Sequence, residues 1–308
     1  MSHPVIPPSL QRGDTIAIVP TARAITIDEL RDGIALAERW GLRVRLGSGV
    51  GRKEFQQAGT AEERVADLQA AIDDPQVRAI WCARGGYGTV QLMERIDLAP
   101  LRNDPKWIIG FSDITVLHNA MCRTGLASLH AQMPHNIRVK SDEAKETLRR
   151  ALFGEAFSIT APAGPVVRPG SCEGVLTGGN LSVLYALRGT PQDIDPTGHI
   201  LVLEDLDELL YHVDRMVMNL KLGGWFKELA GLVIGGMNDM RDKNPDDPFG
   251  ATAEAIIARA IGEVRYPVCS SFPVGHIIDN RALVLGRKAK LSVTANGTTL
   301  SFGGGTGA

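Results

Sequence analysis

The chain has 308 residues, of which 44% are hydrophobic and 22% are charged, and its formal net charge is −2. This composition is typical of a globular protein with a large core, and the length favours two domains over one. The near-neutral charge provides no attraction to nucleic acid or to an anionic membrane surface, so neither is expected as a partner.

The first half of the chain alternates buried strands with amphipathic helices. Continuous apolar runs predict strands at residues 15–20, 43–47, 77–83 and 107–111. Thr26 with Glu29, and Thr60 with Glu63, have the spacing of capping boxes and open helical patterns. Further helical segments follow the third and fourth strands. This alternation predicts a parallel sheet covered by helices, with function at the loops after the strands' carboxyl ends.

The second half is separated from the first by a segment in which periodicity is lost. Residues 156–170 (AFSITAPAGPVVRPG) are rich in Pro, Gly and small residues, which predicts a linker between domains at 1–155 and 171–308. Strand-like runs follow at 174–180, 199–205, 229–236, 267–276 and 282–293, with helical patterns at 209–222 and 251–261. We expect a smaller α/β or β-rich domain, ending in a disordered tail at 302–308.

Several other features are expected to be absent. The four cysteines are widely spaced and show no metal-binding pattern, so neither a metal site nor a disulfide framework is expected. No apolar run approaches the roughly 18–20 residues that span a bilayer. The N-terminal stretch has no basic segment followed by an apolar one. A cytoplasmic protein without membrane contact is the resulting expectation.

The loop RGGYG, residues 84–88, follows the third predicted strand. Its glycines allow a sharp turn and leave backbone N–H groups open to an oxyanion or phosphate. It matches neither G-x-G-x-x-G nor a P-loop. A structural turn, an anion-stabilising loop and a nucleotide site all remain open here.

The segment GFSD places Ser112 between a predicted strand and a helix. A nucleophilic serine uses such a turn because the turn exposes Oγ and puts the helix N-terminus beside developing negative charge. The segment lacks the second glycine of G-x-S-x-G. Ser112 or Asp113 can also simply cap the helix that begins at Ile114. Both interpretations stay open on local sequence alone.

A nucleophilic serine needs a base, and the base needs an orienting acid. His276 and His130 are the histidines that position favours as a base, because each lies near the end of a predicted strand. Glu204 ends the apolar run of LVLEDLDE, where it can be desolvated and orient an imidazolium. On local grounds alone, the four acids of this segment (Glu204, Asp205, Asp207 and Glu208) are better interpreted as solvated turn residues.

Six segments together resemble the serine-type LD-carboxypeptidases, a family that includes murein tetrapeptide carboxypeptidases and microcin C immunity proteins. The segments are CARGGYGTVQL, WIIGFSDIT, LTGGNLSVL, LVLEDLDE with YHVDRM, GLVIGG and FPVGHIIDN. They occur in the family's order and cover nearly the whole chain. The chain departs from the family at SLHAQMP, where Ala131 and Gln132 replace a Gly-Pro pair in the local wall of the site.

The resemblance implies a fold and a set of roles. The fold is an N-terminal flavodoxin-like α/β domain with parallel strands and a smaller C-terminal domain, with the active site in the cleft between them. Ser112 would be the nucleophile, His276 the base and Glu204 the residue that orients it, without metal or other cofactor. Backbone amides of Gly86 and Asp113 would form the oxyanion hole. The residues expected to bind substrate are Arg84, Gly85, Tyr87 and Asn180.

The resemblance also implies an activity: removal of the terminal D-alanine from murein tetrapeptides during cell-wall recycling, by a homodimer. An immunity-type enzyme that cleaves a peptidyl-nucleotide is the alternative, and it would require an aromatic residue to stack the base. Trp225 is the only tryptophan of the second half. A ligand-binding protein built from two α/β domains, and a nucleotide-binding enzyme resting on RGGYG alone, are more distant hypotheses.

Overall fold

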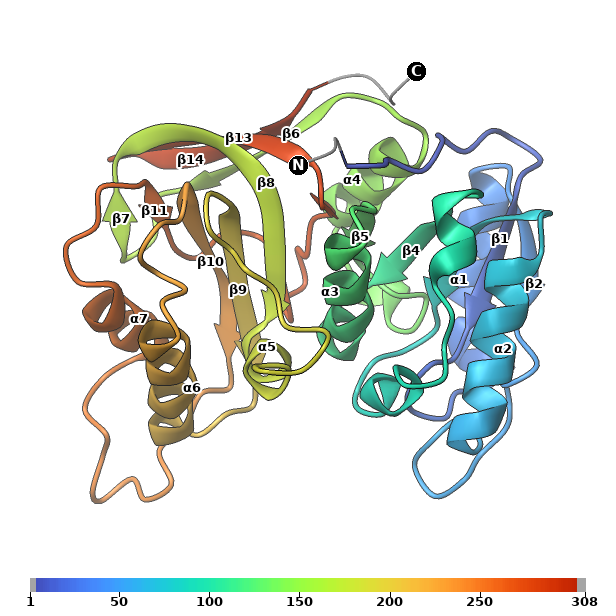
Figure 1. Cartoon of the computed structure of the whole chain (residues 1–308), viewed down its shortest axis with the longest axis horizontal. Coiled ribbons are helices and arrows are strands. Elements are labelled where there is room, and N and C mark those ends of the chain that lie inside the picture. Colours follow the sequence, from blue (N-terminus) through green and yellow to red (C-terminus); the bar gives the residue numbers. More distant parts are fainter. Residues whose placement is uncertain (1–3, 304–308) are drawn as a thin grey trace. The chain divides into compact units, whose positions relative to one another are not determined.

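A computed structural model of the chain describes residues 4–303, and Figure 1 labels its elements. The chain divides into two compact units. The first contains the described residues up to Phe157 together with Ile278–Gly286, and the second contains Ser158–Ile277 and Arg287–Gly303. Each unit is built around one β-sheet.

The first unit has a six-stranded sheet in the order β12-β5-β4-β3-β1-β2. Its strands are β1 (Thr15–Val19), β2 (Arg43–Leu46), β3 (Val77–Cys82), β4 (Trp107–Gly110), β5 (Ser128–His130) and β12 (Leu283–Leu285). Strands β1 to β5 pair in parallel and β12 pairs antiparallel with β5. The parallel order 2-1-3-4-5 is that of flavodoxin-like sheets, which confirms the fold class predicted for this half.

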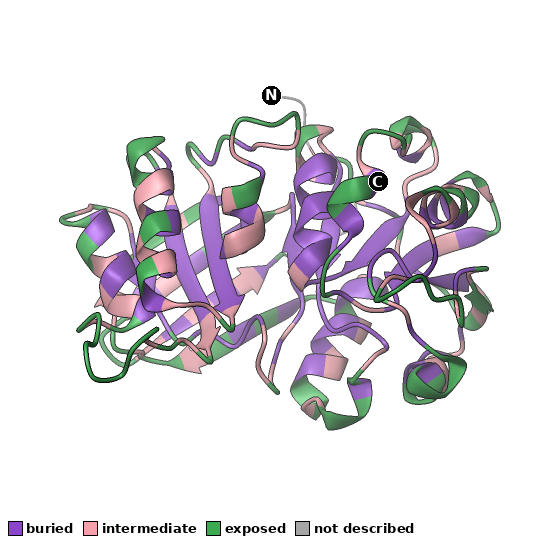
Figure 2. Ribbon diagram, turned by 90° about the horizontal axis from the view of Figure 1, so that it is seen from below, coloured by how far each residue is buried: buried purple, intermediate pink, exposed green. Residues whose placement is uncertain are grey.

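Helices cover this sheet and pack against its strands to form the core. They are α1 (Ile27–Arg39), α2 (Ala61–Asp73), α3 (Thr115–Arg123) and α4 (Asp142–Leu152), with 3-10 turns η1 (Thr89–Leu92), η2 (Ala99–Arg102), η3 (Ser112–Ile114) and η4 (Ile137–Val139). Both predicted capping boxes are present, at the starts of α1 and α2. Leu68 of α2 and Leu117 of α3 belong to one core cluster with strand residues such as Ile80 and Ile108. Figure 2 shows most strand residues buried, although the edge strand β2 is largely exposed.

The second unit has an eight-stranded sheet in the order β6-β14-β13-β8-β9-β10-β11-β7. Its strands are β6 (Phe157–Pro162), β7 (Val167–Arg168), β8 (Gly170–Asn180), β9 (Ile200–Leu206), β10 (Gly231–Asn238), β11 (Val268–Cys269), β13 (Lys288–Thr294) and β14 (Gly297–Phe302). Its helices are α5 (Leu181–Ala186), α6 (Leu210–Leu222) and α7 (Ala253–Ile261). Strands β8 to β11 run parallel, and the outer strands are antiparallel where their pairing is assigned. The predicted mixed second half is confirmed.

The segment predicted as a linker forms strands, and one predicted strand serves both sheets. Strands β6 and β7 lie at the two edges of the second sheet, which are the positions where Pro and Gly are tolerated. The apolar run 282–293 is divided between β12 in the first sheet and β13 in the second. The tail expected to be disordered begins inside β14, and its residues 304–308 lie outside the described part.

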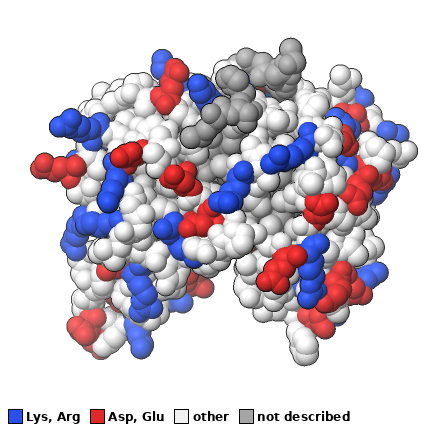
Figure 3. All heavy atoms as spheres, viewed as in Figure 1, with Lys and Arg blue, Asp and Glu red and all other residues white. Residues whose placement is uncertain are grey.

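Within residues 4–303, no helix is both long enough and apolar enough to cross a membrane. Figure 3 shows acidic and basic side chains intermixed on the face in view. This agrees with the small net charge of the sequence, −2.

Candidate active site

The turn after β4 holds Ser112 in a strained backbone conformation. Its φ is 65°, in the left-handed region, which costs most L-residues about 1–2 kcal/mol. Gly110 lets the turn close, because a Cβ there would lie 2.7 Å from Ile114 Cγ1. The N-cap positions of η3 and α3 are Phe111 and Ile114, so Ser112 is not the helix cap that local sequence allowed. A strained serine between a buried strand and a helix is the arrangement of a nucleophile elbow.

His118, on α3, is hydrogen-bonded to the end of β4. Its Nε2 lies 2.9 Å from the Gly110 carbonyl oxygen and its Nδ1 2.8 Å from Ser128 Oγ. A carbonyl oxygen only accepts, so Nε2 carries the proton and Nδ1 accepts from the serine hydroxyl. Burial lowers the pKa of His118 to about 3, so the ring is neutral. This contact fixes the strand two residues before Ser112.

The RGGYG loop lies against the serine. A Cβ on Gly85 would lie 3.2 Å from Ser112 Cβ and 3.4 Å from its Oγ, so only glycine leaves this side of the hydroxyl uncrowded. Gly86, the residue predicted to donate to an oxyanion, has a φ of 109° that favours glycine. The Asp113 carboxylate accepts from Thr89 N at 2.8 Å. Asp113 therefore ties the loop to the elbow through its side chain.

Two charged groups near this loop are buried. Burial raises the pKa of Asp113, against the hydrogen bonds from Thr89 that lower it. The Arg64 guanidinium donates to the Gly88 carbonyl at 2.8 Å and to the Thr21 carbonyl at 2.9 Å. Arg64 is 1% exposed. Its Nη2 donates to Gln91 Oε1 at 2.6 Å. Because these bonds join residues on both sides of the loop's end, we infer that Arg64 holds the end of the loop in place.

In the second unit, Glu204 and His276 form a close pair. Glu204 Oε2 lies 2.7 Å from His276 Nδ1, and the Glu204 side chain is fully buried whereas His276 is 15% exposed. An ionised carboxylate only accepts, so Nδ1 carries the proton and Nε2 is the basic nitrogen of the ring. This is the tautomer that a general base needs.

The backbone around His276 is shaped to make this pair possible. Gly275 has a φ of 100°, and a Cβ on it would lie 2.5 Å from Glu204 Oε2. Glycine is therefore required for the loop to pass over the carboxylate. Asn238 Nδ2 donates to the His276 carbonyl oxygen at 2.8 Å, which holds the loop from the end of β10.

Asn180, at the end of β8, is held by a second buried acid. It is the register partner of Glu204 across β8 and β9. Asp205 Oδ1 accepts from Asn180 Nδ2 at 2.8 Å, and Asp205 Oδ2 accepts from Ser182 N at 2.8 Å. Asp205 is 1% exposed, so the expectation of a solvated turn residue is wrong. Burial and the neighbouring Glu204 raise the pKa of Asp205 to about 7, which marks it as a group whose charge is costly here.

The other candidate residues have varied surroundings. Arg84 Nη1 lies 3.4 Å from Glu29 Oε1, and Tyr87 is 52% exposed. His130, the alternative base, is fully buried beside Phe111 at a ring-centroid distance of 5.8 Å, which places it in the core. Ala131 and Gln132 are also buried. No group of three or more His, Cys, Asp or Glu residues within 4–303 is arranged to hold a metal ion.

Sequence reasoning missed the supporting roles of His118, Arg64 and Asp205. For His118 and Asp205 the only signal was a polar residue within a mostly apolar segment, whereas Arg64 lies in the charged stretch AEERVADL, where nothing distinguishes it from surface residues. A polar residue in such a position is expected to have a hydrogen-bonding partner once buried, but the sequence does not identify that partner.

Comparisons with known proteins assign both halves of the chain. Residues 16–131 match the family profile of the LD-carboxypeptidase N-terminal domain, and residues 173–291 match that of its C-terminal domain. A probable murein peptide carboxypeptidase of Bacillus subtilis is 32% identical over 309 aligned positions, covering 98% of this chain and 96% of the relative.

Solved structures agree with these matches. The crystal structure of a muramoyltetrapeptide carboxypeptidase from Oxalobacter formigenes superposes with a TM-score of 0.85 at 28% identity, covering 94% of this chain and 98% of that one. The microcin C7 self-immunity protein in complex with aspartyl sulfamoyl adenosine also gives 0.85, at 20% identity, over 98% of this chain and 99% of that one. The second likeness shows a shared fold.

Proposed function

Because the chain belongs to the LD-carboxypeptidase family of serine-type hydrolases, we propose that it removes the terminal D-alanine from murein tetrapeptides in cytoplasmic cell-wall recycling. The observation that supports this most directly is the 2.7 Å pair of His276 with the fully buried Glu204. A buried acid that fixes the base tautomer of an imidazole is the arrangement required for acyl transfer to serine.

In the proposed mechanism, Ser112 Oγ attacks the carbonyl carbon between the third residue and D-alanine. His276 Nε2 takes the hydroxyl proton, and Glu204 stabilises the imidazolium that forms. The imidazolium then gives this proton to the leaving amine, so D-alanine departs and the third residue remains as an ester on Ser112. Water, deprotonated by His276, hydrolyses the ester and restores the serine.

The oxyanion of each tetrahedral intermediate is proposed to accept from the backbone amides of Gly86 and Asp113. The strained φ of 65° at Ser112 supports this assignment, because a nucleophile elbow places the following amide beside the hydroxyl. Arg84, Gly85 and Tyr87 on the loop are proposed to bind substrate.

Asn180, in the second unit, is proposed as a further substrate-binding residue, held in place by Asp205. The oligomeric state of the protein, expected to be a homodimer, stays a prediction.

The test is mass spectrometry of tri-, tetra- and pentapeptide muropeptides after incubation with the purified protein. Loss of one alanine from the tetrapeptide alone is expected. The Ser112→Ala variant should lose on the order of 10³-fold or more in rate, with unchanged circular dichroism. An unaltered rate in that variant would rule out the mechanism, and an untouched tetrapeptide would rule out the substrate.

A peptidyl-nucleotide is the alternative substrate, and one observation weighs against it. Trp225, the tryptophan that this alternative would use to stack a base, is 4% exposed and has the Arg188 guanidinium over its ring at 5.0 Å. It is thus a core residue. Incubation with an aminoacyl sulfamoyl nucleoside provides the direct comparison, since release of the amino acid would identify the alternative activity.

A further inference from the structure

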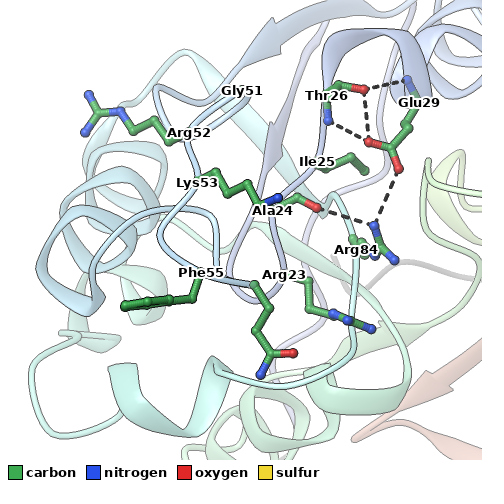
Figure 4. A pocket seen from close by; sticks show the side chains of 11 residues that line it. Arg23, Ala24, Ile25, Thr26, Glu29, Gly51, Arg52, Lys53, Phe55 and Arg84 are labelled. Carbon is green, nitrogen blue, oxygen red and sulfur yellow. Dashed lines mark hydrogen bonds and ion pairs between the residues drawn. The ribbon is translucent and has the colours of Figure 1, made fainter.

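A hollow in the first unit gathers basic side chains around an exposed aromatic ring. It has a volume of about 400 Å³ and is lined by residues 23–26, 29, 51–53, 55–56 and 84. Figure 4 shows the Arg23 and Arg84 guanidinium groups on one side of it and the Phe55 ring on the other. Four of the lining residues are cationic and one, Glu29, is acidic.

Two of the four cations have no acidic partner. Arg84 is paired with Glu29 at 3.4 Å, and Arg52 is paired with Glu63 at 2.6 Å. Within residues 4–303, neither Arg23 nor Lys53 has a carboxylate within 4.0 Å. The hollow therefore keeps two positive charges that nothing in this part of the chain neutralises, which favours an anionic ligand.

The walls of the hollow are fixed by backbone hydrogen bonds. Ala24 N donates to the Gln56 carbonyl at 2.9 Å, and Gly51 N donates to the Ile25 carbonyl at 2.9 Å. Arg84 Nη1 approaches the Ala24 carbonyl at 3.4 Å. The segments at residues 23–26 and 51–56 are thus joined in the absence of a ligand, which lowers the entropic cost of binding.

Phe55, at the edge of this hollow, lies in a loop position where an aromatic residue is unusual. Glu54 and Gln57 exchange backbone hydrogen bonds of 2.9 and 2.8 Å, which makes residues 55–56 a two-residue hairpin loop. Such loops favour Gly, Asn or Asp where φ is positive. Phe55 has a φ of 51° and is 90% exposed. A strained, solvated aromatic gains nothing from packing within the chain, which makes Phe55 a candidate for contact with a ligand.

The hollow lies beside the proposed nucleophile. The Arg23 side chain runs across Gly86, where a Cβ would lie 2.3 Å from Arg23 Cδ, and a Cβ on the preceding Gly85 would lie 3.2 Å from Ser112 Cβ. Consecutive Cα atoms are about 3.8 Å apart. A ligand group in the hollow therefore lies close to Ser112 along the chain of a bound peptide.

We propose that this hollow is a subsite for a carboxylate of the murein peptide, which Arg23 and Lys53 bind while Phe55 covers the neighbouring apolar part of the substrate. The proposal rests on the proposed function, and it adds residues that set substrate charge preference. A phosphate of a peptidyl-nucleotide offers the same oxyanion chemistry, and the experiment separates the two sources.

The experiment compares the tetrapeptide with versions in which each free carboxylate is amidated in turn. For the wild type, one amidation should lower kcat/KM on the order of tenfold, as expected for one charge-assisted contact. The double variant Arg23→Gln/Lys53→Gln should lower kcat/KM for the unamidated peptide by a similar factor. In this variant, the same amidation should lower kcat/KM little further. Arg31→Gln is the control, because Arg31 is 75% exposed and paired with Asp28 outside the hollow.

Phe55→Asn provides an independent readout. Asparagine suits a positive φ, so the variant should melt about 2 °C higher or more, while KM for the tetrapeptide rises several-fold. A residue with only a structural role would not combine higher stability with weaker binding. An unchanged KM would remove Phe55 from the proposal.

The outcomes separate the subsite from the activity. If the wild type releases D-alanine but the amidation penalty persists undiminished in the Arg23→Gln/Lys53→Gln variant, the subsite is refuted and the function stands. If no D-alanine is released, calorimetry on Ser112→Ala with acidic and amidated peptides, and with an aminoacyl sulfamoyl nucleoside or its phosphate analogue, still tests the hollow. Equal affinities for all of them would refute it.

Discussion

Replacing Gly275 by alanine is expected to remove most of the activity while the fold survives. The new Cβ would lie 2.5 Å from Glu204 Oε2 and 2.8 Å from its Cγ, well inside ordinary contact distance. Glu204 is fully buried, so its side chain has little room to shift. The carboxylate must turn away from His276.

The size of the effect follows from the contact that is lost. A charge-assisted hydrogen bond contributes about 1.5–3 kcal/mol, and about 1.4 kcal/mol corresponds to a tenfold change in rate. We therefore expect kcat to fall roughly 10- to 100-fold, and further if the wrong imidazole tautomer forms. The positive φ of 100° at residue 275 adds about 1–2 kcal/mol of destabilisation.

The assay measures D-alanine release together with thermal unfolding. Gly198→Ala is the matched control, because Gly198 lies in the same unit, has a φ of 72° and has no atom within 4 Å of its added Cβ. It should lose stability and keep its activity. If Gly275→Ala retains kcat within about threefold of Gly198→Ala, the Glu204–His276 pair does not have the role assigned to it.

Two titrations provide further predictions, each read as the difference between variant and wild type in unfolding free energy. His118 has a pKa of about 3 in the folded chain, below its usual 6.5. Between these values only the unfolded chain binds the proton, so the unfolding free energy of the wild type falls as the pH drops. The His118→Asn variant should lack about 2 kcal/mol of this fall between pH 7 and pH 5. Asp205 has a pKa of about 7, above its usual 3.8, so its contribution to the unfolding free energy is lost as the pH rises. The stability of Asp205→Asn relative to wild type should therefore be higher at pH 8 than at pH 5. For either variant, a difference from wild type in chemical denaturation that does not change with pH would contradict the assignment.

The flavodoxin-like half could be predicted because its signals are local. Capping boxes at Thr26 and Thr60 and continuous apolar strands each depend on residues close in sequence. The pairing of β12 with β5 could not, because the run 282–293 looks the same whichever sheet it joins. The Pro-rich segment was misinterpreted for a related reason, since edge strands tolerate the composition that also marks linkers.

The candidate site was predictable in its residues and less so in their support. Ser112 sits in a sequence that a cap and a nucleophile share, and only the tertiary contacts that enforce its φ of 65° separate the two. Glu204 and Asp205 alternate along β9, so periodicity assigns them to opposite faces and one of them to solvent. Both are buried because elements cover both faces of the strand.

Each half of the proposed catalytic set is completed by contacts inside its own unit. His118 and Asp113 fix the turn of Ser112 through β4 and the RGGYG loop, whereas Asn238 and the glycine at 275 fix His276 on Glu204. The strained backbone at Ser112 and the desolvated carboxylate of Glu204 each reduce the stability of the fold, and neither residue compensates for the other. The sequence must therefore encode two separately stable supports, which explains why buried polar residues recur beside both halves. It also means that stability effects of variants at His118 and Gly275 should add, because the two residues belong to different units.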